Sequence, residues 1–343
     1  MNLAAKYRPS TLDDVVEQSI VTTMLKSMCA AEELTNRNFL FIGSAGCGKT
    51  TSARAVASLL NEGKGEPIEI DAASHSGVDA MREIVQQAKS YPVGCNYKVF
   101  IIDEVHSISS AGWQVLLKTL EENPAKSVFL LCTTNPEKIP ATILSRVQTF
   151  QFSKISLSGI QSRLEYIIEQ ENSEEGRHIT YTKEAVNYIA KLSNGGMRDA
   201  ITLLDKALAY SEELTLEHLA KSLNLPDYDD YFLLLNAIAK KDNAGIAKII
   251  DRVYNSGVNF VKWFEGFHAF ICNIVKYIFL QDINLTMIPS YYQDKIANYG
   301  TSHSTLCLKL ATKLVKLNQE LKGTQYLQEM AITYLCTPEK RGA

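Results

Sequence analysis

The sequence lacks an excess of either charge, paired cysteines and long uncharged apolar runs. Its 343 residues include 35 Lys and Arg against 38 Asp and Glu, which gives a formal net charge of −3. No part is a basic block, so a domain that binds nucleic acid through a strong positive field is excluded, and any such contact must be local. Hydrophobic residues (46%) and charged residues (21%) occur in ordinary globular proportions, which excludes wholesale disorder.

The cysteines are scattered, and no two of them form a C-x-x-C pair. An odd number without close pairs argues against a disulfide framework and against a zinc knuckle, and it fits a reducing cytosol. They are Cys29, Cys47, Cys95, Cys132, Cys272, Cys307 and Cys336.

The most apolar stretch, residues 260–280, is interrupted by charged side chains such as Lys262 and Glu265. It is therefore a poor membrane span. Its apolar residues recur at spacings of three and four, which predicts a helix buried in a protein core. Residues 1–9 contain no apolar segment of the secretory type, so we expect no signal peptide.

Four short apolar runs punctuate the first 150 residues, and each is followed by a turn and then by a helical pattern. This alternation predicts a parallel sheet with crossover helices, an α/β fold whose ligands bind beyond the carboxyl ends of the strands. The runs are residues 39–42, 68–70, 99–102 and 128–132.

After Phe152 the strand signals stop. Helical patterns predict a small domain that ends near Leu223, and its expected helices are residues 157–171, 183–193 and 199–211. Residues 226–230, which combine Pro, Asp and Tyr, are expected to be a linker to a second helical region that continues to about Leu335.

A phosphate loop of the form G-x-x-x-x-G-K-[ST] follows the first apolar run and precedes a helix-forming run. Its glycines let backbone N–H groups wrap phosphates, and the next helix directs its positive end at them. We expect Lys49 to neutralise the β- and γ-phosphates and Thr50 to ligate Mg²⁺. The motif consists of Gly43, Ser44, Ala45, Gly46, Cys47, Gly48, Lys49 and Thr50.

An acidic pair, Asp103 and Glu104, ends the strand predicted at residues 99–102. Taken alone, an acidic pair after a strand is as often part of an ordinary turn as of a catalytic site. With a phosphate loop before it, Asp103 is expected to hold Mg²⁺ and Glu104 to polarise the attacking water. The nearby Lys118, Glu121 and Glu122 are expected to form a solvated helix face.

These motifs and others in the same order resemble the ATPase subunit of sliding-clamp loaders, which is the gamma/tau subunit of bacterial DNA polymerase III and, more distantly, the small subunits of replication factor C. The resemblance runs from Ala5 to about Leu223, and the rest of the chain matches only in length and helical character. The further motifs are Lys6-Tyr7-Arg8-Pro9 with Val15-Val16 and Gln18, Glu69-Ile70-Asp71-Ala72-Ala73-Ser74, Ile102-Asp103-Glu104-Val105-His106, Leu117-Lys118-Thr119-Leu120-Glu121-Glu122, Thr142-Ile143-Leu144-Ser145-Arg146 and Gly195-Gly196-Met197-Arg198-Asp199-Ala200.

The resemblance implies an α/β AAA+ nucleotide-binding domain over residues 1–153, an all-α lid over 154–224 and an all-α collar over 225–343. It implies ATP and Mg²⁺ as cofactors. Beyond the phosphate loop and the acidic pair, the residues implied to bind the nucleotide are Thr51, Tyr7, Arg8, Pro9, Val15 and Val16.

The resemblance also implies roles for four polar residues outside the phosphate loop. Thr134 would be the first sensor of the γ-phosphate, with its neighbour Thr133 as the alternative. Arg198 would be the second sensor, reaching the phosphates from the lid of the same subunit. Arg146 would be an arginine finger, given to the ATP of the adjacent subunit in the ring.

The implied function is the loading of a sliding clamp onto primer-template DNA by a five-membered ring of this chain's copies and other loader subunits. The compartment would be the cytosol of a bacterium or of a bacteriophage's host, with no membrane and no zinc involved. DNA contact would be independent of sequence and would weaken with salt, although helix capping explains the same serines equally well. The candidate segments are Ser74, His75 and Ser76, then Ser109 and Ser110, then Lys138 for DNA, and residues 86–95 for the clamp.

Some features depart from the family pattern. Only residues 61–67 stand where the family usually has a cysteine-rich zinc module, and Glu17 and Val147 stand where Gly and Cys are common. The chain also stops where the polymerase- and helicase-binding tail of tau would begin, which would suit a bacteriophage-encoded loader. Two other hypotheses are an ATP-binding subunit that braces a ring without hydrolysis, and a different AAA+ remodeller such as a branch-migration motor.

Overall fold

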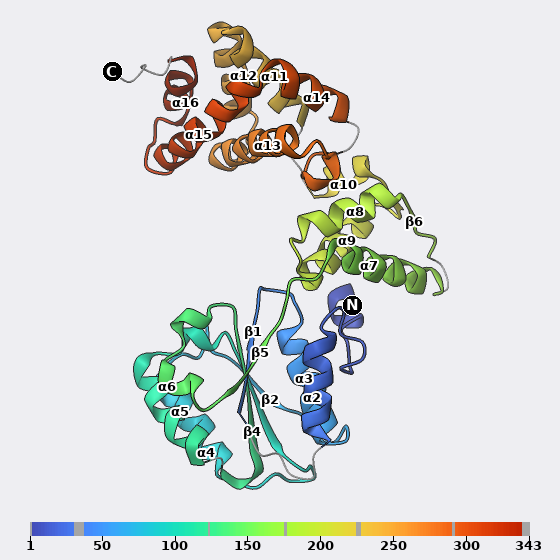
Figure 1. The fold of residues 1–343 in the computed structure, drawn as a ribbon, viewed down its shortest axis with the longest axis vertical. Coiled ribbons are helices and arrows are strands. Elements are labelled where there is room, and N and C mark those ends of the chain that lie inside the picture. The colour runs from blue at the N-terminus through green and yellow to red at the C-terminus, as the bar shows by residue number, and fades with distance from the viewer. Residues whose placement is uncertain are drawn as a thin grey trace. The chain divides into compact units, whose positions relative to one another are not determined.

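The computed structural model of the protein describes residues 2–30, 38–122, 124–174, 177–223, 228–289 and 292–337. The chain forms two compact units, residues 1–213 and 214–343. The first contains a sheet covered by helices, and the second consists of helices (Figure 1). The division into three domains at residues 153 and 224 stays a prediction.

A five-stranded parallel sheet forms the centre of the first unit. Its strands are β1 (Asn38–Ile42), β2 (Ile68–Asp71), β3 (Lys98–Asp103), β4 (Ser127–Thr133) and β5 (Gln148–Gln151). They lie in the order β2-β3-β4-β1-β5, with Leu40 opposite Leu131 and Ile70 opposite Ile102. Every residue of β1 and β4 is buried, as expected for central strands that are covered on both faces.

The four predicted apolar runs are confirmed as β1 to β4, whereas the sequence did not predict β5. Only one residue of β5, Phe150, is buried, and its neighbours in the strand are polar or exposed. A short strand at the edge of a sheet needs only one inward side chain, so β5 carries no apolar run for a sequence pattern to detect.

Alternate residues of the central strands point into two separate hydrophobic cores, one on each face of the sheet. Helices α2 and α3 cover one face, and helices α4, α5 and α6 lie on the other (Figure 1). The helices of this part are α1 (Leu3–Lys6), α2 (Ser19–Cys29), α3 (Lys49–Leu60), α4 (Val78–Ala88), α5 (Ser110–Glu122) and α6 (Ala141–Leu144). The helices that connect the parallel strands hold the carboxyl ends of those strands at one edge of the sheet, and the polar motifs lie at that edge.

Three further helices complete the first unit. They are α7 (Leu157–Asn172), α8 (Lys183–Leu192) and α9 (Met197–Tyr210), which confirms the three helices predicted after Phe152. Ser156 caps α7 because its hydroxyl accepts a hydrogen bond from the Gly159 N–H at 3.0 Å. The short strands β6 (Thr180–Tyr181) and β7 (Glu213–Leu214) form a second sheet, and the boundary between the units falls inside β7.

The second unit contains one aromatic-rich core, formed by buried residues between Tyr231 and Leu335. Its helices are α10 (Leu216–Ser222), α11 (Tyr228–Lys240), α12 (Asn243–Asn255), α13 (Phe260–Leu280), α14 (Gln293–Ser302), α15 (Ser304–Leu321) and α16 (Leu327–Cys336). The linker expected at residues 226–230 is wrong from Tyr228 onward, because α11 begins there. Residues 226 and 227 lie outside the described residues.

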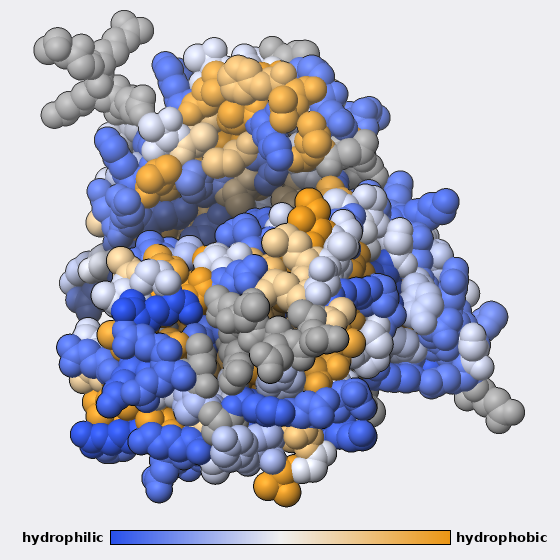
Figure 2. All heavy atoms as spheres, turned by 60° about the horizontal axis from the view of Figure 1, so that its bottom comes forward, coloured by the Kyte–Doolittle hydropathy of each residue, from blue (hydrophilic) through white to orange (hydrophobic). Residues whose placement is uncertain are grey.

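Helix α13 confirms the core helix that the apolar periodicity predicted. Phe264, Phe267 and Ile271 on one side of it have almost no exposed surface. Across the described parts of the chain, no helix has the length and apolar character needed to span a bilayer. Hydrophilic side chains cover most of the face drawn in Figure 2, and the apolar side chains on it form limited patches.

Candidate nucleotide-binding site

The phosphate loop connects β1 to α3 with a backbone that only glycine adopts easily. Gly46 and Gly48 have φ of +71° and +107°, and Gly48 is the N-cap of α3. A side chain on Gly43 would approach the Phe152 carbonyl oxygen to 2.7 Å. The loop is therefore tightly wrapped at the amino end of a twelve-residue helix, the arrangement that binds phosphate groups.

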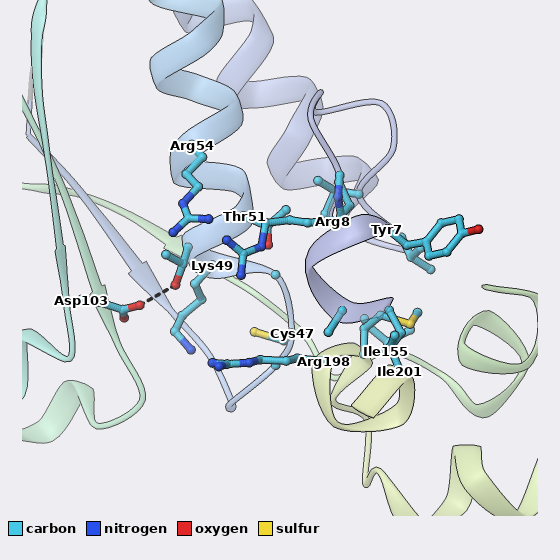
Figure 3. A pocket seen from close by; sticks show the side chains of 18 of the residues that line it. Tyr7, Arg8, Cys47, Lys49, Thr51, Arg54, Asp103, Ile155, Arg198 and Ile201 are labelled. Carbon is cyan, nitrogen blue, oxygen red and sulfur yellow. Dashed lines mark hydrogen bonds between the residues drawn. The ribbon is translucent and has the colours of Figure 1, made fainter. Parts of the chain in front are cut away.

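Lys49 and Thr50, the first residues of α3, point in two directions from the loop. The Lys49 ammonium group is buried and donates hydrogen bonds to the carbonyl oxygens of Gly43 and Ser44 at 3.0 and 2.9 Å. The Thr50 hydroxyl donates to Oδ2 of Asp103 at 2.6 Å (Figure 3). A hydroxyl and a carboxylate side by side are the oxygen ligands that Mg²⁺ accepts, so the residues present fit that ion.

A cavity of about 460 Å³ lies over the phosphate loop, a size typical of sites for small molecules. Lys49 and Arg198 extend toward the end of the cavity where Asp103 lies, and Tyr7, Ile155 and Ile201 lie at the other end (Figure 3). The predicted residues that line it are Tyr7, Arg8, Pro9, Val15, Val16, Gly46, Cys47, Gly48, Lys49, Thr50, Thr51, Asp103 and Arg198. The cavity thus has a polar, cationic end and a more apolar end, which suits a nucleotide.

The lid touches the phosphate loop directly. The Met197 N–H, in the first turn of α9, donates to the Gly46 carbonyl oxygen at 3.0 Å. A side chain on Gly46 would come within 3.1 Å of the Gly196 Cα. This contact places Arg198, the next residue of α9, at the cavity.

The N-terminal segment is joined to α7 by a buried carboxylate, Glu171, whose side chain is 2% exposed. Its Oε1 accepts hydrogen bonds from Lys6 Nζ and from the Tyr7 hydroxyl, both at 2.7 Å, and Arg177 binds its other oxygen. Burial alone would raise the pKa of Glu171, but the hydrogen bonds from Lys6 and Tyr7 and the neighbouring positive charges outweigh it and lower the pKa. Burial and the bond to Glu171 raise the pKa of Tyr7 to about 12.

Glu17, the departure from the family's usual glycine, has a left-handed backbone with φ of +56°. Its carboxylate accepts hydrogen bonds from the Ser156 N–H at 2.6 Å and from the Ser156 hydroxyl at 2.5 Å. A carboxylate is favourable at a helix N-terminus, and Ser156 caps α7. These contacts offset the cost of the left-handed backbone and give the N-terminal segment a second contact with α7.

Glu104 follows β3 in a left-handed conformation with φ of +49° and is held by two side chains. Its Oε2 accepts a hydrogen bond from the Thr134 hydroxyl at 3.2 Å and lies 3.2 Å from Nδ1 of His106. Thr133 is fully buried, and its hydroxyl pairs with His106 and with the Asn135 N–H. Thr134 is therefore the threonine that contacts Glu104, and His106 is a contact that the sequence motifs did not reveal.

Arg146 does not line the cavity of its own chain. Its Nε donates to Oε1 of Glu121 at 2.6 Å, and its Nη1 donates to the Thr142 carbonyl oxygen at 2.6 Å and to Ser145 Oγ at 2.9 Å. Glu121 is exposed, as expected for a solvated helix face, but it is also paired with Arg146 across 25 positions of sequence, which was not predicted. Lys118 and Glu122 do form an exposed pair, at 3.6 Å.

The residues proposed to contact DNA lie on the surface, and only some of them lie at the first turn of a helix. Ser109 Oγ accepts a hydrogen bond from the Gly112 N–H at 3.1 Å in the first turn of α5, so capping is confirmed for that serine. Ser74 bonds to Asp71, and α4 begins only at Val78. Lys138 is exposed and is the last residue of Pro136–Lys138, a single turn of 3-10 helix. His75, Ser76 and Ser110 are partly or fully exposed.

Several polar residues at the cavity were not among the predicted ligands. Arg54, one turn after the phosphate loop, makes two 2.5 Å hydrogen bonds to Glu69 of β2 through Nε and Nη2. Arg163 of α7 lines the cavity and donates to the Tyr7 carbonyl oxygen at 3.1 Å. These pairs could not be predicted from sequence patterns, because they join residues 15 and 156 positions apart. Among the described residues, no group of three His, Cys, Asp or Glu side chains could hold a metal ion by itself.

Comparison with known protein families gives two matches in the first unit. Residues 66–156 match the family described as DNA polymerase III, delta subunit. Residues 159–213 match the family described as DNA polymerase III clamp loader subunit, ATPase lid domain. The second match covers α7 to α9, so the lid assignment of these helices is supported independently of their packing.

Solved structures with a similar fold include the Holliday junction branch migration motor RuvB of Thermotoga maritima. It is 22% identical, with a TM-score of 0.52 over 68% of this chain and 79% of that one. At that identity the likeness shows the fold alone. Together with the lid match, it confirms an α/β AAA+ domain followed by helical regions.

Curated relatives extend the comparison to most of the chain. The DNA polymerase III subunit gamma/tau of Mycoplasma genitalium is 30% identical over 92% of this chain and 58% of its own length, and the subunit tau of Bacillus subtilis is 35% identical over 72% and 49%. The chain thus spans about half the length of these relatives. The DNA polymerase III subunit gamma of Buchnera aphidicola is 31% identical over 86% of this chain and 85% of its own length. This chain therefore belongs to the DNA polymerase III gamma/tau family of clamp loader subunits.

Proposed function

We propose that this chain is the ATPase subunit of a clamp loader, which opens a sliding clamp, places it on primer-template DNA and releases both on ATP hydrolysis. The observation that carries the proposal is the convergence of the phosphate loop, the Thr50–Asp103 pair and Arg198 on one cavity. A phosphate-binding loop alone would fit many nucleotide-binding proteins. The lid and family membership narrow the proposal to clamp loading.

In the proposed site, the apolar end of the cavity holds the adenine against Val15, Val16 and Ile201. The loop N–H groups and Lys49 hold the phosphates. The Lys49 ammonium group then exchanges the carbonyl oxygens of Gly43 and Ser44 for phosphate oxygens, a stronger charge-assisted contact.

Thr50 and Asp103 would hold Mg²⁺, which supplies positive charge next to the β- and γ-phosphates. Glu104 orients and polarises the attacking water as general base. Its contact with Thr134 supports a sensor role for this threonine, because loss or gain of the γ-phosphate would change the partner of the same hydroxyl. Arg198 approaches the phosphates from α9.

Arg146, like Glu104 and Thr134, is not among the residues that line the cavity. In this proposal, which follows the resemblance to the family, Arg146 serves the nucleotide of the adjacent subunit. Hydrolysis then depends on assembly of a ring, here five subunits that include copies of this chain. Residues 1–153, 154–224 and 225–343 act as the nucleotide-binding, lid and collar domains. The proposed compartment is the cytosol of a bacterium or of a phage's host.

The proposed clamp contact is the segment 86–95. Tyr91 and Val93 in the loop after α4 are 72% and 93% exposed, which is unusual for large apolar side chains and fits a surface that docks on a partner. DNA contact through the exposed serines before α4 and at the start of α5 would involve phosphates only, and would therefore weaken with rising salt.

Steady-state ATP hydrolysis by the loader complex tests the proposal. We expect clamp and primed DNA together to raise the rate above that with either alone, and we expect Lys49→Ala to abolish ATP binding. A complex whose hydrolysis is equally fast without clamp and DNA would argue against a loader. Unchanged ATP binding by Lys49→Ala would argue against the phosphate-loop assignment.

A further inference from the structure

Glu121 and Arg146 form a pair that the motif-based account of the site does not use. Glu121 lies in the last turn of α5, and Arg146 follows α6. Arg146 Nε donates to Glu121 Oε1 at 2.6 Å, and Nη2 lies 2.5 Å from the same oxygen. Both side chains are partly exposed, at 33% for Arg146 and 43% for Glu121.

The Arg146 guanidinium group is also held from its other side. Nη1 donates to the Thr142 carbonyl oxygen and to Ser145 Oγ, at 2.6 and 2.9 Å. All three nitrogens of the group therefore have partners on their own chain. A long side chain that would otherwise sample many rotamers is fixed in one orientation.

Orientation matters for a group that stabilises charge across an interface. An arginine that must reach a phosphoryl group on another subunit loses effect steeply when it is misplaced, because a shift of about 1 Å can cost roughly 10²-fold in rate. A contact formed before the reaction costs no reorganisation during it. An acidic partner lowers the net positive charge near the site, but it fixes the plane of the guanidinium fork.

We propose that Glu121 is a positioning residue for Arg146, which holds the guanidinium group in the orientation that serves the nucleotide of the adjacent subunit. This inference rests on the proposed function of Arg146 as a finger acting in trans. Glu121 does not line the cavity of its own chain, so its removal leaves ATP binding by that chain intact.

The test uses the complete loader, assembled with variant copies of this chain, and measures kcat and KM for ATP with clamp and primed DNA. We expect Arg146→Ala to lower kcat by about 10³-fold, the low end of the effect of arginine fingers. We expect Glu121→Ala to lower kcat by about 10-fold with unchanged KM, since a misplaced finger retains part of its effect. Glu121→Gln, which keeps an oxygen acceptor, should fall between Glu121→Ala and the wild type.

The matched control is Glu122→Ala, the adjacent glutamate of α5, whose exposed partner is Lys118. It should leave kcat unchanged. The double variant Glu121→Ala with Arg146→Ala should be no slower than Arg146→Ala alone, because Glu121 acts only through Arg146. The mass of each assembled complex should equal that of the wild type.

The outcomes separate the two proposals. Normal hydrolysis by Arg146→Ala would refute the trans finger itself. A slow Arg146→Ala with a normal Glu121→Ala would refute only the positioning role. Faster ATP hydrolysis by Glu121→Ala would show that Glu121 restrains Arg146 and would overturn the inference. A double variant whose kcat falls by the product of the two single effects, or a complex of smaller mass, would assign Glu121 to a different role and would also overturn it.

Discussion

Glu171→Gln should destabilise the first unit by an amount that depends on pH. Glu171 is buried, and it binds Lys6, Tyr7 and Arg177 together. Glutamine has nearly the same shape as glutamate but carries no charge. Its NH₂ group would replace one carboxylate oxygen, and it would then face a hydrogen-bond donor that this oxygen now accepts from. The substitution therefore tests electrostatics and not packing.

The magnitude follows from the number of contacts. A hydrogen bond to a charged group contributes roughly 1.5–3 kcal/mol. Glutamine keeps one acceptor and loses the other, so we expect a loss of about 2 kcal/mol in the free energy of unfolding. For a unit of 213 residues, each kcal/mol corresponds to about 2–4 °C in Tm, which predicts a fall of about 4–8 °C at pH 7.

The pH dependence has a defined sign because the pKa of Glu171 is lowered in the folded state. An unfolded glutamate has a pKa of about 4.3, so the unfolded chain takes up this proton first as the pH falls. The stabilisation by Glu171 is fully present above that value and is lost as the pH falls through the folded-state pKa. The difference in Tm between wild type and Glu171→Gln should therefore shrink toward zero below about pH 4.

The assay is thermal unfolding followed by fluorescence in a Trp263→Phe background. The chain has two tryptophans, and Trp113 is buried in the first unit. The control is Glu174→Gln, which removes a 55% exposed partner of Lys6 and should cost much less, since exposed ion pairs contribute about 0–1 kcal/mol. Equal losses of Tm for the two variants, or a Glu171→Gln difference in Tm that stays constant from pH 7 to pH 3, would show that the buried charge of Glu171 does not stabilise the fold.

Two further predictions concern the phosphate loop. Gly46→Ala should lower ATP affinity by at least about 10-fold, since the left-handed backbone and the approach to Gly196 together cost upwards of about 1.4 kcal/mol. Titration with a fluorescent ATP analogue measures the affinity. The control is Gly63→Ala, where a side chain meets no neighbouring atom, and equal affinity in the two variants would contradict the prediction. Burial raises the pKa of both the Cys47 and the Cys272 thiols, but Cys47 is 1% exposed and Cys272 is exposed. A maleimide should therefore modify Cys47 more slowly than Cys272, and ATP should slow the modification of Cys47 further. Mass spectrometry of the modified peptides measures both rates, and faster modification of Cys47 would show that the loop is open.

The sequence predicted the central strands and the phosphate loop because their signals are local. The residues of β1 and β4 are buried without exception, so the apolar runs had no interruptions to obscure them. The carboxyl ends of parallel strands meet at one edge, which brought Asp103 to Thr50 as the motif predicted. The edge strand β5 was missed because one buried phenylalanine makes no pattern.

Contacts between distant residues could not be predicted in the same way. Glu121 pairs with Arg146, and Glu171 with Lys6, over 25 and 165 positions of sequence. The spacing of charges along α5 predicted the exposure of Glu121 but not its partner, because a helical pattern describes one helix and not what packs beside it. Glu17 was visible as a departure from the family pattern, but its partner Ser156 became apparent only in the fold.

Clamp transfer to DNA is the decisive measurement of clamp loading by this chain. A labelled sliding clamp is incubated with the complete loader, ATP and circular primed DNA, and the clamp that remains on the DNA is measured after gel filtration. We expect ATP-dependent transfer by the wild-type loader and none when its copies of this chain carry Lys49→Ala. Transfer that proceeds without ATP, or a wild-type loader that hydrolyses ATP and leaves no clamp on the DNA, would contradict it.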